Sequence, residues 1–176
     1  MVTKKLNQKQ WTKIDLINWS NKYLKSKGIQ NSRKESEWFL SAIYNCNRLD
    51  LYLQFDQIVA EEQLKIFKSF ILRRLQNEPF QYIIKKAPFY GRDFYVNKHV
   101  LIPRPETEIL IDILKKRNKV ESILDVGTGS GCLAITASLE NISNKIYALD
   151  NQEQVITIAK KNSDNFKCKN INFKIM

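Results

Sequence analysis

The stretch Asp125-Val126-Gly127-Thr128-Gly129-Ser130-Gly131 decides the fold, because a buried-type strand over 122–126 runs directly into a glycine-rich turn. Beyond the turn, apolar residues recur first at helical spacing and then in short runs typical of strands. This alternation predicts a parallel sheet with right-handed crossovers. The expected elements are a helix over 132–139, a strand over 145–149 that ends at Asp150, a helix over 154–162 and a strand over 171–175.

The spacing of the three glycines indicates which ligand the turn holds. Open α/β sheets bind ligands at the carboxyl ends of their strands, and glycines there let the backbone approach closely. The pattern is D-x-G-x-G-x-G and not G-x-G-x-x-G, the spacing in which a helix N-terminus receives a pyrophosphate. S-adenosylmethionine has no phosphate, so the spacing favours a methyltransferase. A nicotinamide or flavin enzyme and a non-binding α/β domain stay open as alternatives.

The acidic residue that ends the next strand is the second part of this motif. Asp150 is placed to accept hydrogen bonds from both hydroxyls of a ribose. The candidate cofactor-binding residues are therefore Asp125, Gly127, Thr128, Gly129, Ser130, Gly131 and Asp150.

A metal site is not expected. The single histidine, His99, argues against a multi-histidine centre and is better explained by a structural role. Cys46, Cys132 and Cys168 are odd in number and widely spaced, which fits neither a zinc pattern nor a disulfide framework. We expect three free thiols.

The first part of the chain, 1–77, predicts a small helical bundle. Apolar residues recur at helical spacing from Trp11 to Leu24, and Asn31 or Ser32 can cap a second helix with Glu35 near its N-terminal dipole. A shorter apolar piece over 48–55 and a helix over 61–76 follow. Nothing in this part resembles a catalytic constellation, and its aromatic residues are expected in the core.

The composition changes at Glu78-Pro79. The runs Phe80–Ile84 and Phe89–Val96 are rich in β-branched and aromatic residues and predict a bent β-hairpin linker over 78–104. The segment Ile102-Pro103-Arg104-Pro105-Glu106-Thr107-Glu108 follows. Its second proline is placed to open a helix, so that taken alone the segment predicts a stiff helix start at the beginning of a sheet domain over 105–176.

Composition excludes several classes of protein. The chain has 176 residues, 43% hydrophobic and 27% charged, which excludes disorder as the main state and allows one good-sized domain or two small ones. The formal charge of +11 lies mostly in the first half, as a lysine-rich solvated surface or as a docking face for an acidic or RNA-bound partner. No stretch is long and apolar enough for a membrane helix, and Met1–Gln10 lacks the apolar core of a signal peptide, so we expect a cytoplasmic protein.

These motifs together resemble those of the release factor glutamine methyltransferases, the PrmC/HemK family, and the resemblance covers essentially the whole chain. It rests on the helical N-terminal part and on the combination of IPRPETE with DVGTGSG. The segments that carry it are Asn77-Glu78-Pro79-Phe80-Gln81-Tyr82-Ile83, Phe89–Val96, Ile102–Glu108, Asp125–Gly131 and Asp150.

The resemblance implies a reaction, a cofactor and a partner. The reaction is transfer of a methyl group from S-adenosylmethionine to the side-chain amide nitrogen of the glutamine in the Gly-Gly-Gln motif of peptide-chain release factors. Residues 1–77 would be the release factor docking domain, and Arg104, Pro105, Glu106 and Thr107 would border the substrate. The resemblance implies no direct DNA binding and, for a complete protein, a monomer.

The sequence departs from the family in one respect. The Asn-Pro-Pro-Tyr motif that grips the substrate amide in the family is absent, so the catalytic residues are unknown. The sheet of the family is also larger than three strands. We therefore hypothesise that the chain is the front part of a longer enzyme and is inactive alone. The alternatives are a non-catalytic binding module or decayed fragment, and a methyltransferase acting on a ribosomal-protein glutamine.

Overall fold

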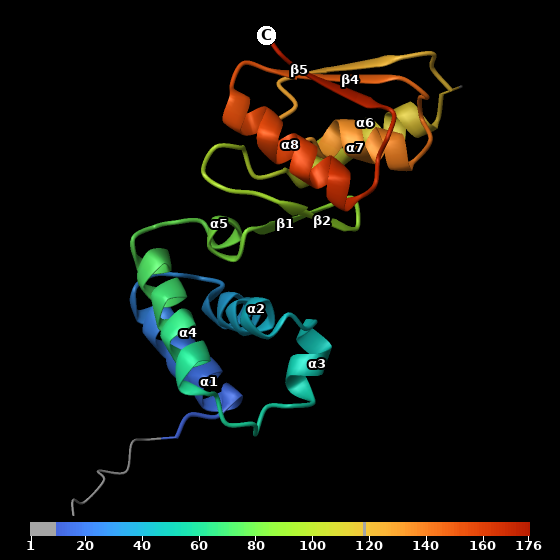
Figure 1. Ribbon diagram of the computed structural model, residues 1–176. Coiled ribbons are helices and arrows are strands. Elements are labelled where there is room, and N and C mark those ends of the chain that lie inside the picture. Colours follow the sequence, from blue (N-terminus) through green and yellow to red (C-terminus); the bar gives the residue numbers. More distant parts are fainter. Residues whose placement is uncertain (1–9, 118) are drawn as a thin grey trace, which may run out of the picture. The chain divides into compact units, whose positions relative to one another are not determined.

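The computed structural model describes residues 10–117 and 119–176, and the chain divides into two compact units (Figure 1). The helical unit extends to Ile84, and the sheet unit runs from Lys85 to Met176. The expectation about a signal peptide falls on residues 1–9, which lie outside the described residues. Among the described residues, no helix combines the length and apolar composition that crossing a membrane requires.

Two helices of the helical unit have reciprocal side-chain caps at their N-termini, whereas Asn31, at the N-cap position of the second helix, makes no side-chain cap hydrogen bond. At the first helix, the Thr12 side chain accepts a hydrogen bond from the Asp15 amide, and the Asp15 side chain reaches back to the Thr12 amide. Asn47 and Asp50 form the same reciprocal cap. Phe39, Phe67 and their apolar neighbours fill the core. The helices are α1 (Lys13–Ser26), α2 (Ser32–Tyr44), α3 (Arg48–Tyr52), α4 (Glu61–Leu75) and α5 (Phe80–Ile84).

Two glutamates of α2 are buried, which helical periodicity does not predict. Glu35 pairs with Arg74 of α4 over 2.6 Å, so its partner is a side chain of another helix as well as the N-terminal dipole of its own. The Glu37 carboxylate is fully buried and accepts hydrogen bonds from Arg33, Arg48 and Tyr52. Paired charges of this kind satisfy the rule that buried ions need partners.

The expected hairpin is present, but its position corrects the prediction. Phe80–Ile84 is one helical turn, α5, and not a strand: the Pro79 carbonyl accepts hydrogen bonds from the amides of Tyr82 and Ile83, and Ile83 is buried. The hairpin is formed by β1 (Lys86–Phe89) and β2 (Arg92–Tyr95). A two-residue turn at Tyr90 and Gly91 joins them, and both have positive φ, as a hairpin of this length requires.

The sheet unit confirms the expected parallel sheet with right-handed crossovers, which is the first part of a Rossmann-like fold. Its strands are parallel in the order β3-β4-β5, with Ile123 opposite Ile146 and Ile146 opposite Ile171. The first helix begins with Pro105 at its N1 position, as predicted. The elements are α6 (Pro105–Lys115), β3 (Ile123–Val126), α7 (Cys132–Leu139), β4 (Ile146–Asp150), α8 (Glu153–Asn165) and β5 (Ile171–Ile175).

The described helices of this unit cover one face of the sheet. Both crossovers move in the same direction across the sheet, and their right-handedness therefore puts α7 and α8 on the same side (Figure 1). Ile146 and Ala148 are buried on that face. On the other face, Leu124 is 61% exposed and Val126 is 59% exposed, although parallel sheets are ordinarily covered on both sides.

Candidate functional site

The turn after β3 brings three glycines together for two different physical reasons. Gly127, Gly129 and Gly131 all have positive φ, which side chains rarely tolerate. An added Cβ at Gly127 would meet no atom within 4 Å, and one at Gly129 would meet only the Gly127 carbonyl at 3.9 Å. The space above these two residues is therefore free for a ligand. At Gly131 an added Cβ would lie 2.9 Å from Ile135 Cδ1, so this glycine serves close packing.

Hydrogen bonds fix the turn to the end of β4. The amides of Gly127 and Thr128 both donate to the Leu149 carbonyl over 2.9 Å. The Gly129 amide donates to Asp150 Oδ2 over 3.1 Å, and Asp150 Oδ1 accepts from the Asn151 amide over 2.9 Å. The half-buried Asp150 carboxylate thus has a fixed orientation at the carboxyl edge of the sheet, and each oxygen has a further lone pair for a hydroxyl donor.

Asp125 and Thr128 stabilise the turn from within. Thr128 Oγ1 donates to Asp125 Oδ2 over 2.8 Å. Burial raises the pKa of Asp125 above its ordinary value, and the nearby charge of Asp150 acts in the same direction, whereas hydrogen bonds from Thr128 and the Ala134 amide oppose the shift. Both residues therefore shape the turn from its inner side.

The four residues expected near the substrate lie at the start of α6. Arg104 precedes α6 and Pro105 begins it, and the Thr107 amide donates to the Arg104 carbonyl over 3.0 Å. Within the described part of the chain, no hydrogen bond or ion pair joins the side chains of 104–107 to 127–131. Their placement next to the substrate stays a prediction.

The neighbouring Glu108 holds α6 to the hairpin, a contact that the sequence analysis missed. Glu108 Oε1 accepts a hydrogen bond from the Tyr90 amide over 2.8 Å, and the Tyr90 hydroxyl donates to Asp112 over 2.8 Å. The only available signal was the last glutamate of IPRPETE, which sequence alone places in the first turn of a helix. The sequence also did not predict that Asn162 of α8 is buried and hydrogen-bonded to the Ser130 carbonyl, because an asparagine in a surface helix gives no signal of burial.

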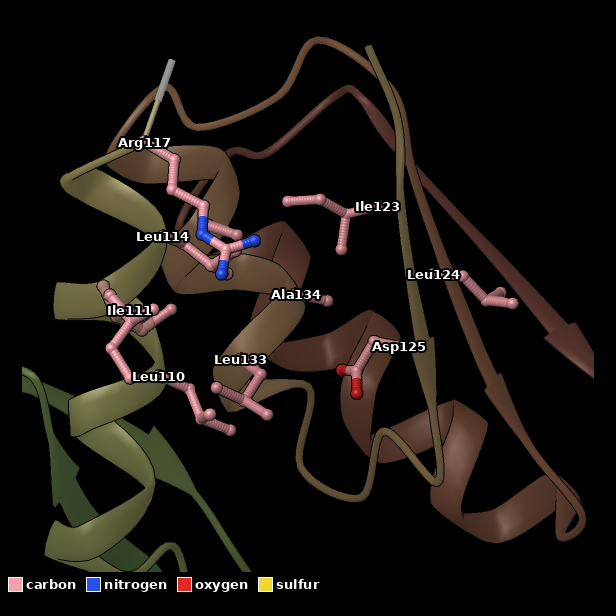
Figure 2. Close-up of a pocket in the computed structure, with 11 residues that line it drawn as sticks. Leu110, Ile111, Leu114, Arg117, Ile123, Leu124, Asp125, Leu133 and Ala134 are labelled. Carbon is pink, nitrogen blue, oxygen red and sulfur yellow. The ribbon is translucent and has the colours of Figure 1, made fainter. Parts of the chain in front are cut away.

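An apolar pocket of about 260 Å³ lies between α6, β3 and α7 (Figure 2). Ile123 and Asp125 point from β3 toward α7, whereas Leu124 points to the opposite side of the strand. Asp125 is the residue that this pocket shares with the candidate cofactor set. The pocket therefore lies at the outer edge of β3 and is distinct from the space above Gly127 and Gly129.

The described residues contain no cluster of histidine, cysteine, aspartate or glutamate that could hold a metal ion. Cys46, Cys132 and Cys168 are free thiols, as predicted. Burial raises the pKa of the Cys132 thiol, which keeps it protonated and unreactive next to the glycine turn.

The parallel sheet, the open glycine turn and the aspartate fixed beside it define the class of protein: a Rossmann-like methyltransferase domain. Residues 15–84 match the family model described as PrmC N-terminal domain, and 105–176 match that of ribosomal protein L11 methyltransferase (PrmA). The release factor glutamine methyltransferase of Geobacter sulfurreducens is 34% identical over 88% of this chain and 55% of the relative. That of Chlorobaculum tepidum is 35% identical over 89% of this chain and 56% of the relative.

Over most of its length the chain is similar to release factor glutamine methyltransferases, and it spans just over half the length of these relatives. The family is one of methyltransferases, so S-adenosylmethionine is the cofactor expected at the glycine turn. Among solved structures, the ribosomal protein L11 methylase of Lactobacillus delbrueckii subsp. bulgaricus gives a TM-score of 0.39 at 23% identity, covering 51% of this chain and 48% of the other.

Proposed function

We propose that this chain supplies the cofactor turn and the release factor docking domain of an S-adenosylmethionine-dependent methyltransferase. Its substrate is the glutamine side-chain amide in the Gly-Gly-Gln motif of peptide-chain release factors. The observation that carries the proposal is the hydrogen bond from the Gly129 amide to Asp150, beside two glycines whose Cβ positions are open.

The residues present fit this cofactor. Asp150 would accept hydrogen bonds from the ribose hydroxyls. Its two oxygens are held in place by the Gly129 and Asn151 amides, and each has a further lone pair. Gly127 and Gly129 leave room for the amino-acid part of the ligand, where any side chain would fill the space. The bound cofactor supplies an electrophilic methyl group. Asp150 and the glycine turn would hold the cofactor and orient this methyl group.

The helical unit supports the docking role. It matches the N-terminal domain of the family over 15–84. It also exposes large apolar side chains at Leu49, Leu53 and Ile58, with exposed fractions of 77%, 86% and 58%. Exposed apolar side chains near one another in the chain are the features that protein partners bind. We propose a cytoplasmic enzyme with no direct role for DNA.

The 176 residues alone are expected to be inactive, because no Asn-Pro-Pro-Tyr sequence is present to hold the substrate amide. The test is incubation of the chain with release factor and radiolabelled S-adenosylmethionine, beside a release factor whose Gly-Gly-Gln glutamine is replaced by alanine. We expect no label on either protein. Label on the unmodified release factor alone would overturn the expected inactivity and support the substrate. If ribosomal protein is added in place of release factor and becomes labelled, the proposed substrate is wrong.

A further inference from the structure

One buried side chain joins the glycine turn to the hairpin. Asn162 of α8 is 0% exposed and lies in the middle of the sheet unit. Its Oδ1 accepts a hydrogen bond from the Tyr95 amide over 2.8 Å, and its Nδ2 donates to the Tyr95 carbonyl over 2.9 Å and to the Ser130 carbonyl over 2.8 Å. The amide group therefore contacts two segments that are distant in sequence, one at the end of β2 and one inside the turn.

These three bonds require an asparagine side chain in one orientation. Both Nδ2 protons are donated to carbonyls and Oδ1 faces an N–H donor, so the amide cannot flip without opposing like groups. Because Asn162 is fully buried, water cannot replace a lost hydrogen-bond partner of its amide group, and the loss lowers the stability of the fold.

The same face of α8 also packs against the turn one helical turn earlier. An added Cβ at Gly131 would lie 3.3 Å from the Cβ of Ala159 and 3.4 Å from its Cα, so Gly131 lies directly against the helix. Residues three apart lie on one helix face, and Ala159 and Asn162 thus contact Gly131 and Ser130 side by side. Lys161 precedes Asn162, and its Nζ lies 3.6 Å from the centre of the Tyr95 ring.

We propose that Asn162 is a positioning residue that fixes the carbonyl of Ser130, and with it the shape of the cofactor turn, to the end of the hairpin. The chain leaves the hairpin at Tyr95 and continues into the IPRPETE segment before α6. A ligand that stabilises the turn therefore also stabilises the chain that leads to this segment. The inference rests on the proposed function only in naming the turn as the cofactor site.

The test is amide hydrogen exchange by NMR on the whole chain, with Asn162→Asp compared with wild type at neutral pH. Aspartate has the same shape, but its carboxylate would face two carbonyl oxygens and could no longer donate. We expect the protection of the Gly129 and Gly131 amides and of the Tyr95 amide to fall by about tenfold or more together. Lowering the pH protonates the new carboxyl and restores one donor, so part of the protection should return.

The matched control is Asn165→Asp, which adds the same charge to the same helix at an exposed position. It should leave the protection of Gly129, Gly131 and Tyr95 unchanged. Unchanged protection of the turn in Asn162→Asp, or a loss confined to Tyr95, would overturn the inference. If Asn162→Asp does not fold, the exchange of the Asn162 side-chain protons in the wild-type chain tests the inference instead. Both Nδ2 protons should exchange slowly, and fast exchange of either would contradict the proposed role of Asn162.

This measurement needs no cofactor. A chain that failed to bind S-adenosylhomocysteine would therefore count against the proposed function and leave the exchange result standing. If the chain binds S-adenosylhomocysteine but Asn162→Asp leaves the protection of the turn unchanged, only the inference about Asn162 is overturned.

Discussion

The Gly129 amide and the Asp150 carboxylate are joined by a hydrogen bond of 3.1 Å, which ties the turn after β3 to the end of β4. These are neighbouring parallel strands, so the bond closes the carboxyl edge of the sheet at the point where such sheets bind ligands. The carboxylate that holds the turn is also the group that we propose to accept hydrogen bonds from a ribose, so on this proposal the shape of the site and its chemistry depend on one side chain.

The two units can be followed by separate signals. The three tryptophans, Trp11, Trp19 and Trp38, all lie in the helical unit, so tryptophan fluorescence reports on that unit alone. Far-UV circular dichroism reports on both units, and the two signals together assign a change in stability to one of them.

Replacing Glu37 with glutamine should destabilise the helical unit by about 1–3 kcal/mol, because a fully buried carboxylate loses its ionic hydrogen bonds to Arg33 and Arg48. Urea unfolding followed by tryptophan fluorescence measures this. The control is Glu61→Gln, which breaks a pair with Lys65 whose two side chains are 76% and 74% exposed and which should therefore change stability much less. Equal effects of the two substitutions would contradict the account of the buried cluster.

Replacing Gly131 with alanine should destabilise the sheet unit more than the same change at Gly127. Both have positive φ, +80° and +77°, so each substitution should cost about 1–2 kcal/mol from backbone strain. The Gly131 variant adds a contact of 2.9 Å with Ile135 Cδ1, worth about 1–3 kcal/mol more. The circular dichroism transition should therefore shift further for Gly131→Ala while the tryptophan signal stays unchanged. A larger effect at Gly127 would show that the packing argument is wrong.

Asp125 should make the sheet unit less stable as the pH rises. Burial raises its pKa in the folded chain above its ordinary value, so the folded state holds the proton to higher pH than the unfolded state does. Between those two pKa values, the unfolding free energy of wild type should fall with increasing pH relative to that of Asp125→Asn, and the difference should level off above them. Unfolding followed by circular dichroism from pH 4 to 7 measures the difference. A difference that grows in favour of wild type with pH would mean that the pKa is lowered instead.

The uncovered face of the sheet should promote self-association. Leu124 is 61% exposed beside the free edge of β3, and unpaired apolar edges associate with other chains. Leu124→Lys should leave the unfolding free energy within about 0.5 kcal/mol and shift sedimentation toward the monomer. The control is Leu72→Lys in the helical unit, at a side chain that is 51% exposed. If Leu124→Lys leaves association unchanged, or if both variants reduce it equally, the uncovered face of the sheet does not have this role.

Local patterns predicted much of the fold. The helix over 132–139 and the strand over 171–175 match α7 and β5, because a run of small apolar residues after glycine and a short β-branched run have clear periodicity. Phe80–Ile84 was assigned as a strand because a five-residue apolar run has the same composition in a strand and in one helical turn. In the structure, the Pro79 carbonyl accepts the hydrogen bonds that form the helical turn, and burial of Ile83 stabilises it.

The sequence also predicted the parts of the site that lie in one motif, but not those that depend on distant contacts. The glycine turn and Asp150 follow from the spacing of strands and glycines. The roles of Asn162, Glu108 and Glu37 do not, since each depends on a partner on another element, and periodicity describes only one element at a time.

The most direct test of the central claim is calorimetric titration of the chain with S-adenosylhomocysteine, in wild type and in Asp150→Ala. The account predicts that wild type binds, that Asp150→Ala loses at least about tenfold in affinity because the ribose acceptor and the Gly129 contact are both removed, and that NADH does not bind. No binding by wild type, binding that Asp150→Ala leaves unchanged, or binding of NADH in its place would contradict it.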